Sequence, residues 1–323
     1  ISTSCNFTSP EDPSISVTVT RSGLPTFFAR IWGAGASTAT ATGKAEAYNP
    51  SGSTTVPIQL QSVKPWLIPN CVPNTVPPCA NPLLPHFINS SSNYTLPNPS
   101  TYIGLSYVFK QTRTPVSGGY YALDLTQGTI NCPATSAAPA GSCNNVTSDA
   151  YQENIACSNT ATLSCGDTVT VHPNPNSAAM KTDTTEGTQC LIHTTANGNP
   201  AGSCNADSDP DCFVSGSPVT INGGSFNPDP SMQATNISRS DSVVTVPVFD
   251  FQTAADDPCP TSACGHSVKV IGFLQLGIQS ISLGGSGRIG AYILNASGCD
   301  PSSAGNPAVA GNGLSPVAVR LTQ

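Results

Sequence analysis

Charged residues are scarce in this sequence, and that scarcity limits what the protein can be. Lys, Arg, Asp and Glu make up only 9% of the 323 residues, whereas soluble globular domains usually carry about a quarter. Hydrophobic residues still make up 38%, which argues for a folded chain rather than a disordered one. The net charge of −7 gives no reason to expect a nucleic-acid or anionic-membrane partner.

Other absences narrow the class further. No stretch approaches the roughly 18 consecutive apolar residues of a membrane span, so none is expected in this chain. The sequence also has no G-x-S-x-G, no H-E-x-x-H and no P-loop. Its four histidines are scattered, at no metal-ligand spacing from one another. These motifs therefore indicate no particular catalytic chemistry, and the members of a nucleophile triad need not lie close together in sequence.

Alternating residues predict strands at both ends of the chain. Residues 14–20 place Ile15, Val17 and Val19 on one face, and residues 36–48 carry Ala or Gly at nearly every second position. Ten prolines between residues 57 and 99 exclude long regular elements there. Further strand-like segments are "IGLSYVFK", "GGYYALDL", "TVTV", "DSVVTVPVFDF", "SVKVIGFLQLGIQSISL", "GRIGAYIL" and "VAVRLT".

These spacings predict a mainly β fold with no long helical period. We expect a disulfide-pinned, antiparallel β-sandwich-like core with one short helix near the N-terminus and long Pro-rich loops. Residues 1–55 form a strand-helix-strand segment, and residues 56–323 form a β-rich domain that is continuous with it or separate from it. The predicted helix begins near Pro25 and carries a stripe of bulky apolar residues, Phe27, Phe28, Ile31 and Trp32, that would pack on the small-residue strand.

Thirteen cysteines without a C-x-x-C pair indicate disulfides formed in an oxidising compartment rather than a zinc site. Spacing alone cannot fix connectivity, but several cysteines lie close enough in sequence to close short loops. The candidate pairs are Cys71 with Cys79, Cys132 with Cys143, Cys157 with Cys165, Cys204 with Cys212, and Cys259 with Cys264. Cys5, Cys190 and Cys299 are left over, and the odd total leaves one thiol free, bridged to another chain or separated from its partner.

One acidic cluster is a candidate metal site. "NADSDPDC" places Asp207, Asp209 and Asp211 at alternating positions of one loop, and oxygen ligands at such spacing can converge on calcium. The EF-hand pattern is not met, because the required Gly and Glu are missing. A solvated acidic turn is the simpler interpretation.

The N-terminal stretch resembles a known family. "VTVTRSGLPTFFARIWGAGASTATATGKAEAYNPSG" is similar to the region that follows the membrane anchor in bacterial TadE/TadG-like proteins of Flp (Tad) pilus assembly. The motif residues are Pro25, Thr26, Phe27, Phe28, Arg30, Ile31, Trp32 and Gly33. "VKPWLIPNC", with Lys64, Pro65, Trp66 and Cys71, extends the similarity, as do patches over most of the chain. The resemblance implies a non-enzymatic cell-envelope or extracellular protein linked to pilus assembly, anchoring or adhesion.

Two functions remain open on the sequence alone. The first is a secreted or surface-exposed structural protein, a subunit or accessory of a bacterial pilus or filament. Its partners would be copies of itself or other envelope proteins, and Ile15, Val17 and Val19 would form an assembly strand that completes a neighbour's sheet. The second is an extracellular, calcium-dependent binding or adhesion module directed at a carbohydrate or another surface ligand, supported by Asp207, Asp209 and Asp211.

Overall fold

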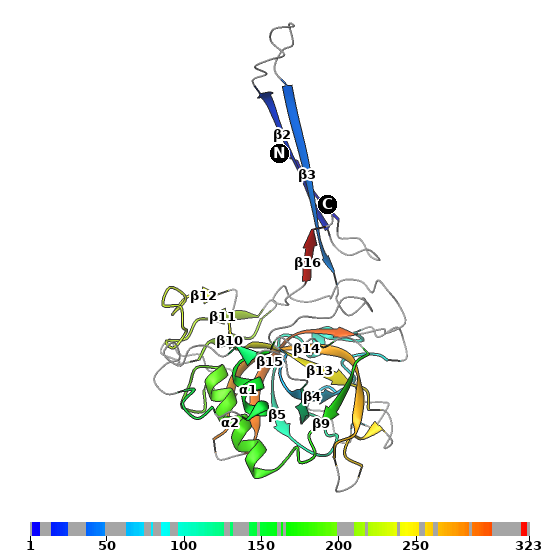
Figure 1. The fold of residues 1–323 in the computed structure, drawn as a ribbon, viewed down its shortest axis with the longest axis vertical. Helices are drawn as coiled ribbons and strands as arrows, with labels where there is room; N and C mark the ends of the chain where they lie inside the picture. The colour runs from blue at the N-terminus through cyan, green and yellow to red at the C-terminus, as the bar shows by residue number, and fades with distance from the viewer. Residues whose placement is uncertain are drawn as a thin grey trace.

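A narrow upright sheet stands on a broad body in the computed structural model of the chain (Figure 1). We call it the projecting sheet. Its strands run in the order β1 (Ser2–Asn6), β2 (Ser14–Leu24), β3 (Ser37–Tyr48) and β16 (Ala318–Leu321), and every neighbouring pair is antiparallel. The structure describes residues 2–6, 14–24, 37–48, 63–73, 79, 85–90, 96–125, 130–131, 142–146, 149–159, 163, 166–198, 210–216, 219–237, 240–251, 256–260, 264–283, 286–298 and 318–321.

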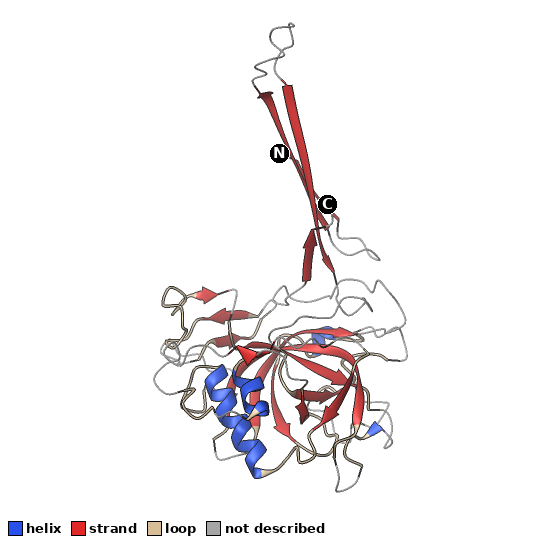
Figure 2. Ribbon diagram, viewed as in Figure 1, coloured by secondary structure: helices blue, strands red, loops and turns tan. Residues whose placement is uncertain are grey.

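The body is built on a closed ring of strands, seen in red in Figure 2. The ring contains β4 (Trp66–Pro69), β5 (Ser106–Gln111), β6 (Gly119–Asp124), β13 (Val243–Phe249), β14 (Ser267–Ile281) and β15 (Arg288–Gly298). They pair in the order β13-β4-β6-β5-β15-β14, and β14 pairs with β13 again, which closes the ring. β9 (Thr168–Val171) adds to it by pairing with both β14 and β6.

Apart from β5, whose residues alternate between buried and exposed, the strands of the ring are buried on both faces. On β4, Trp66 and Ile68 belong to the largest apolar cluster, while Leu67 between them belongs to a second cluster. Successive side chains of a strand point to opposite faces, so the two clusters lie on opposite sides of this strand. Tyr120 and Tyr121 of β6 divide between the same two clusters. Burial on both faces explains why these strands are nearly continuous apolar runs rather than alternating ones.

Two helices pack against each other beside the ring, shown in blue in Figure 2. α1 (Ala150–Ala156) is capped by Asp149, and α2 (Ala178–Leu191) is capped by Ser177, whose hydroxyl accepts a hydrogen bond from the backbone N–H of Met180. Gly187 lets the helices approach closely, since a Cβ there would lie 2.9 Å from the Cβ of Ile155 and 3.0 Å from the backbone oxygen of Gln152.

Smaller elements complete the described structure. β10 (Cys212–Val214), β11 (Thr220–Asn222) and β12 (Asn236–Ile237) form a three-stranded sheet, and Phe213 lies directly over Gly277 of β14. β7 (Ile130–Asn131) pairs with β8 (Ser158–Asn159), and a single 3-10 turn, η3, spans Pro99–Thr101.

The prediction of a mainly β fold is confirmed, and each quoted strand-like segment contains a strand. The main sheet is mixed rather than purely antiparallel, because β4 runs parallel to β13 and β5 parallel to β6. The closed ring is also a different arrangement from the predicted sandwich-like core, which is not confirmed. The helix predicted from Pro25 lies outside the described residues, as do residues 49–62, where the predicted boundary at residue 55 falls.

The expectation that no long helix occurs is wrong, because α2 spans 14 residues. Its buried side is made largely of small and polar residues, including Thr184, Thr185, Gly187 and Thr188. The buried hydroxyl of Thr184 has hydrogen-bond partners inside the protein. It lies 2.8 Å from the carbonyl oxygen of Met180 and 2.9 Å from the hydroxyl of Tyr151. A helix without a stripe of large apolar residues leaves little periodic signal in a sequence.

We predict that Gly187→Ala destabilises the body, although Ala is usually preferred to Gly inside a helix by about 1 kcal/mol. The added methyl group would push α2 away from Gln152 and Ile155, and overpacking of this kind costs about 1–3 kcal/mol. Urea unfolding measures the change, with Thr182→Ala on the exposed side of α2 as the control. A Gly187→Ala variant more stable than the parent would contradict this helix packing.

Candidate functional site

The projecting sheet is the candidate functional surface, because it contains the predicted assembly strand. Within β2, Ile15 pairs with Ala45, Val17 with Gly43 and Val19 with Ala41 of β3. Ile15 and Val17 also pair with β1 on their other side. These two residues are therefore enclosed in their own sheet, and only Val19 lies beyond the end of the β1 pairing.

Both faces of this sheet are open to solvent where its side chains are described. Val19 is 46% exposed, and a Cβ added at Gly43 would have nothing within 4 Å. The opposite face carries threonine pairs across β2 and β3. The hydroxyls of Thr18 and Thr42 lie 3.0 Å apart, and those of Thr20 and Thr40 lie 3.2 Å apart. Cross-strand threonine pairs stabilise a sheet locally, without a buried core beneath it.

The projecting sheet narrows away from the body. β1 covers the outer edge of β2 only as far as Thr18, and β16 covers the outer edge of β3 only from Ala45 to Tyr48. In the described part of the chain, residues 19–24 and 37–44 thus pair on one side only. An uncovered strand edge presents N–H and C=O groups that another strand can bind.

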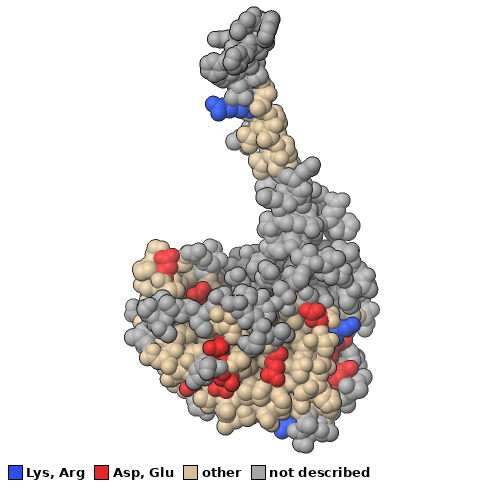
Figure 3. Space-filling view, in the orientation of Figure 1, with Lys and Arg blue, Asp and Glu red and all other residues tan. Residues whose placement is uncertain are grey.

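Charge is distributed unevenly between the two parts. Figure 3 shows acidic side chains scattered over the visible face of the body, whereas the described surface of the projecting sheet has a single basic group. That group is Arg21, the one charged residue among the described side chains of β2 and β3. In this described part of the sheet, hydrated charged groups therefore do little to prevent pairing with another sheet.

The predicted calcium loop is only partly described. Asp207 and Asp209 lie outside the described residues, and Asp211 is 4% exposed. One carboxylate oxygen of Asp211, Oδ1, accepts hydrogen bonds from the backbone N–H of Gly224 at 2.9 Å and from Nδ2 of Asn227 at 3.0 Å. The other, Oδ2, accepts from Asn227 and from the hydroxyl of Ser240. Asp211 thus organises two neighbouring loops through its own hydrogen bonds.

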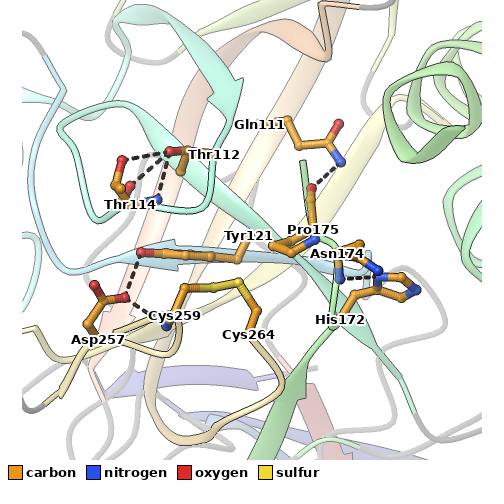
Figure 4. Close-up of a disulfide and its surroundings, with 10 residues drawn as sticks. All are labelled: Gln111, Thr112, Thr114, Tyr121, His172, Asn174, Pro175, Asp257, Cys259 and Cys264. Atoms are coloured by element: carbon orange, nitrogen blue, oxygen red, sulfur yellow. Dashed lines mark hydrogen bonds between the residues drawn. A yellow bond between two sulfur atoms is a disulfide. The ribbon is translucent and has the colours of Figure 1, made fainter. Parts of the chain in front are cut away.

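No cluster of three His, Cys, Asp or Glu side chains suited to a metal occurs among the described residues. Calcium binding by Asp207, Asp209 and Asp211 therefore stays a prediction. Asp257, just before the Cys259–Cys264 loop, is likewise engaged in hydrogen bonds (Figure 4). Its Oδ1 accepts a hydrogen bond from the backbone N–H of Cys259 at 2.8 Å and a long one from the hydroxyl of Tyr121 at 3.5 Å.

The disulfides agree with the sequence prediction in two places and correct it in one. Cys71–Cys79 and Cys259–Cys264 are both formed. Cys143 pairs with Cys190 rather than with Cys132, because packing of α1 on α2 brings their Cα atoms to 4.5 Å despite 47 residues of separation. A loop of that length contributes about 4 kcal/mol in the chain-entropy model, and the bridge joins the turn that precedes α1 to α2.

Cys157 and Cys212 are also disulfide-bonded. Their predicted partners, Cys165 and Cys204, lie outside the described residues, so these pairings stay predictions. The three described bridges fit a protein of an oxidising compartment. Neither described helix is long and apolar enough to cross a membrane.

Lys64, within the "VKPWLIPNC" segment, is a buried cation that the sequence alone did not single out. Its side chain is 2% exposed, and its Nζ donates hydrogen bonds to the carbonyl oxygens of Cys157 at 2.7 Å and Asn154 at 3.4 Å, at the C-terminal end of α1. Burial lowers the pKa of Lys64 from 10.5 to about 7, although the charge of Asp241 opposes the shift. Lys64 thus links the segment just before β4 to the C-terminal end of α1.

Comparison with known proteins adds no identification: no family model matches the sequence, and searches of curated proteins and of solved structures return no match. The resemblance to TadE/TadG-like proteins rests on the quoted residues alone.

We predict that Asp211→Asn costs about 1–3 kcal/mol of stability, because an amide N–H₂ would replace an acceptor among buried donors. Urea unfolding in calcium and in EDTA measures the loss, with Asp209→Asn as the matched variant from the same cluster. The structure favours an equal loss in both media for Asp211→Asn. A loss seen only in calcium, and shared by Asp209→Asn, would instead establish the metal site.

We predict that Lys64 makes stability rise with pH between about 7 and 10.5. Below pH 7 the amine is protonated in both states, whereas between the folded and unfolded pKa values only the unfolded chain keeps the proton. The free energy of unfolding of the parent minus that of Lys64→Met should therefore increase over this window, by at most about 1.4 kcal/mol per pH unit. Urea titrations at pH 7, 8, 9 and 10, after alkylation of any free thiol, measure it; a flat difference refutes it.

Proposed function

We propose that the chain is a secreted or cell-surface structural protein of bacteria, a subunit or accessory of a pilus or other filament. The observation that supports the proposal most strongly is the projecting sheet. It extends away from the body, its described side chains are exposed at residues 19–22 and 38–43, and its edges are partly uncovered (Figure 1). A sheet in this position serves contact with other molecules better than it serves the folding of its own body.

The body supports the same proposal. Every described residue of the apolar clusters lies between Val63 and Ala296, so the body has a core to which the projecting sheet contributes no described residue. Disulfides between loops and helices suit a protein that must persist outside the cell. The resemblance of residues 17–52 and of "VKPWLIPNC" to TadE/TadG-like proteins points to the same setting.

In this proposal the partners are further copies of the chain or other pilus and envelope proteins, and the protein carries out no catalytic step. Strand pairing at the edges of the projecting sheet supplies the contacts, since backbone hydrogen bonds across an exposed edge give affinity without a deep pocket. Ile15 and Val17 serve as the inner strand of that sheet rather than as its contact edge.

We predict that antibodies against the body label surface filaments of the producing bacterium in immunogold electron microscopy. A strain that produces the chain without residues 1–24 should export the protein but lose the filament label, because β1 and β2 are then missing from the projecting sheet. A strain carrying Thr182→Ala, on the exposed side of α2, should label as the parent does. Label inside the cytoplasm, or equal filament label with the truncated chain, would rule the proposal out.

A further inference from the structure

The outer edge of β3 is the most accessible pairing surface in the described structure. β16 pairs with β3 from Tyr48 to Ala45 and ends there, while β2 occupies the opposite side of β3 along its length. Among the residues that the structure describes, 37–44 consequently keep one side without a strand neighbour. At about 3.4 Å per residue, this edge is on the order of 27 Å long, which is enough for a short ladder.

The outer edge of β2 is less suited to pairing. β1 leaves residues 19–24 of β2 uncovered, but Arg21 lies in this stretch and is exposed. The register with β3 is also irregular there, since Arg21 pairs with Ala39 and the next pair is Leu24 with Ser37. Charged residues and bulges are the features by which proteins protect strand edges against unwanted pairing.

Along its uncovered edge, β3 has such a protective feature only at one end, at Lys44. Residues 37–43 contain no charge and no proline, and the pairs between Ala39 and Glu46 follow one another without a break. Lys44, the first charged residue of the strand, stands at the end nearest to β16. A long uncharged edge without a bulge is an open template for another strand.

The sequence of this edge is also self-complementary. The five residues from Thr38 to Thr42 alternate Thr and Ala and read the same in both directions about Thr40. If two such strands pair antiparallel on a two-fold axis at Thr40, every Thr faces a Thr and every Ala faces an Ala. The threonine hydroxyl pairs already present between β2 and β3 would then continue across the new pair.

We propose that two copies of the chain associate through antiparallel pairing of β3 with β3 of the second copy, centred on Thr40. The inference deepens the proposed function and rests on it, because it names the partner and the edge that the projecting sheet uses. The contact is isologous, as expected for a two-fold dimer. It produces a four-stranded sheet β2-β3-β3-β2 in place of two exposed two-stranded ribbons, each of which is marginally stable alone.

The geometry of the molecule permits this contact. β3 begins at its far end, at Ser37, and runs toward the body, which lies beyond Tyr48 (Figure 1). Antiparallel pairing centred on Thr40 places the two bodies at opposite ends of the shared sheet, where they do not meet. β16 and the second copy's β3 then follow one another along the same edge of β3.

The test compares two lysine substitutions of equal charge. Thr40→Lys places two ammonium groups opposite each other on the two-fold axis, whereas Thr20→Lys places the same charge on the neighbouring strand of the same exposed face. Both variants lose the Thr20–Thr40 hydroxyl pair, so they differ only in their position relative to the proposed contact. The two lysines of a Thr20→Lys dimer are separated by three strand spacings, roughly 14 Å. This distance exceeds the Debye length of about 8 Å at 0.15 M salt, so their repulsion is largely screened.

Size-exclusion chromatography with light scattering on the full chain gives the readout. We expect the parent and Thr20→Lys to have twice the monomer mass of 32.9 kDa, and Thr40→Lys to bind itself at least about tenfold more weakly. Thr40→Glu should also be weakened, and mixing it with Thr40→Lys should restore the dimer through opposite charges. Equal unfolding midpoints of all variants show that the body is intact.

Three results would overturn the inference: a parent that stays monomeric, a Thr40→Lys variant as dimeric as Thr20→Lys, or a mixture of Thr40→Lys and Thr40→Glu that does not associate. These outcomes are independent of the immunogold experiment. If surface filaments incorporate the Thr40→Lys variant normally, the β3 contact is refuted and the proposed function stands. If the chain forms the dimer but is found in the cytoplasm, the proposed function is refuted and the β3 contact stands.

Discussion

The closure of the ring by β13 is the constraint on which the body depends. β13 pairs with β14 along its length and with β4 at Val248 and Phe249, so segments 180 residues apart (Ile68 and Val248) must meet before either face of the ring is covered. The helices depend on that closure. Lys64, just before β4, binds carbonyl oxygens at the end of α1, and Gln111, at the end of β5, donates a hydrogen bond to Pro175 just before α2. The Cys143–Cys190 bridge then joins the turn that precedes α1 to α2.

The projecting sheet is under the opposite constraint, because none of its described side chains is fully buried. Its described stabilisation comes from backbone ladders and from threonine hydroxyls paired across β2 and β3. Near the body four strands are paired with one another, whereas farther out only β2 and β3 are paired among the described residues. Pairing with a further strand would therefore change the stability of this outer part more than that of the rest of the sheet. The disulfide-bonded body provides lasting stability, whereas the projecting sheet provides a surface for contact with other molecules. This division suits a protein that works in an assembly.

The sequence predicted elements wherever the pattern was local. Alternation identified β2 and β3, and apolar runs identified β13, β14 and β15. It did not predict the helices, because the buried side of α2 is made of residues such as Thr184 and Thr188 that give no apolar period. Nor did it predict the Cys143–Cys190 bridge, since neighbours in sequence are not neighbours in space once α1 packs on α2. The roles of Lys64 and Asp211 were equally out of reach, because each is set by partners far away in the chain.

Small residues in two elements show how a shared composition can have opposite meanings. In α2, a side chain at Gly187 would collide with Ile155 and Gln152, so the glycine is explained by a neighbour within the chain. In β3, a side chain at Gly43 would meet nothing, and the alanines and threonines beside it are exposed. Among the described residues no element approaches Gly43, so close packing within the described chain does not explain the small residues of β3. The symmetric Thr-Ala alternation about Thr40 offers another explanation, because it is the pattern that the proposed pairing of two β3 strands requires.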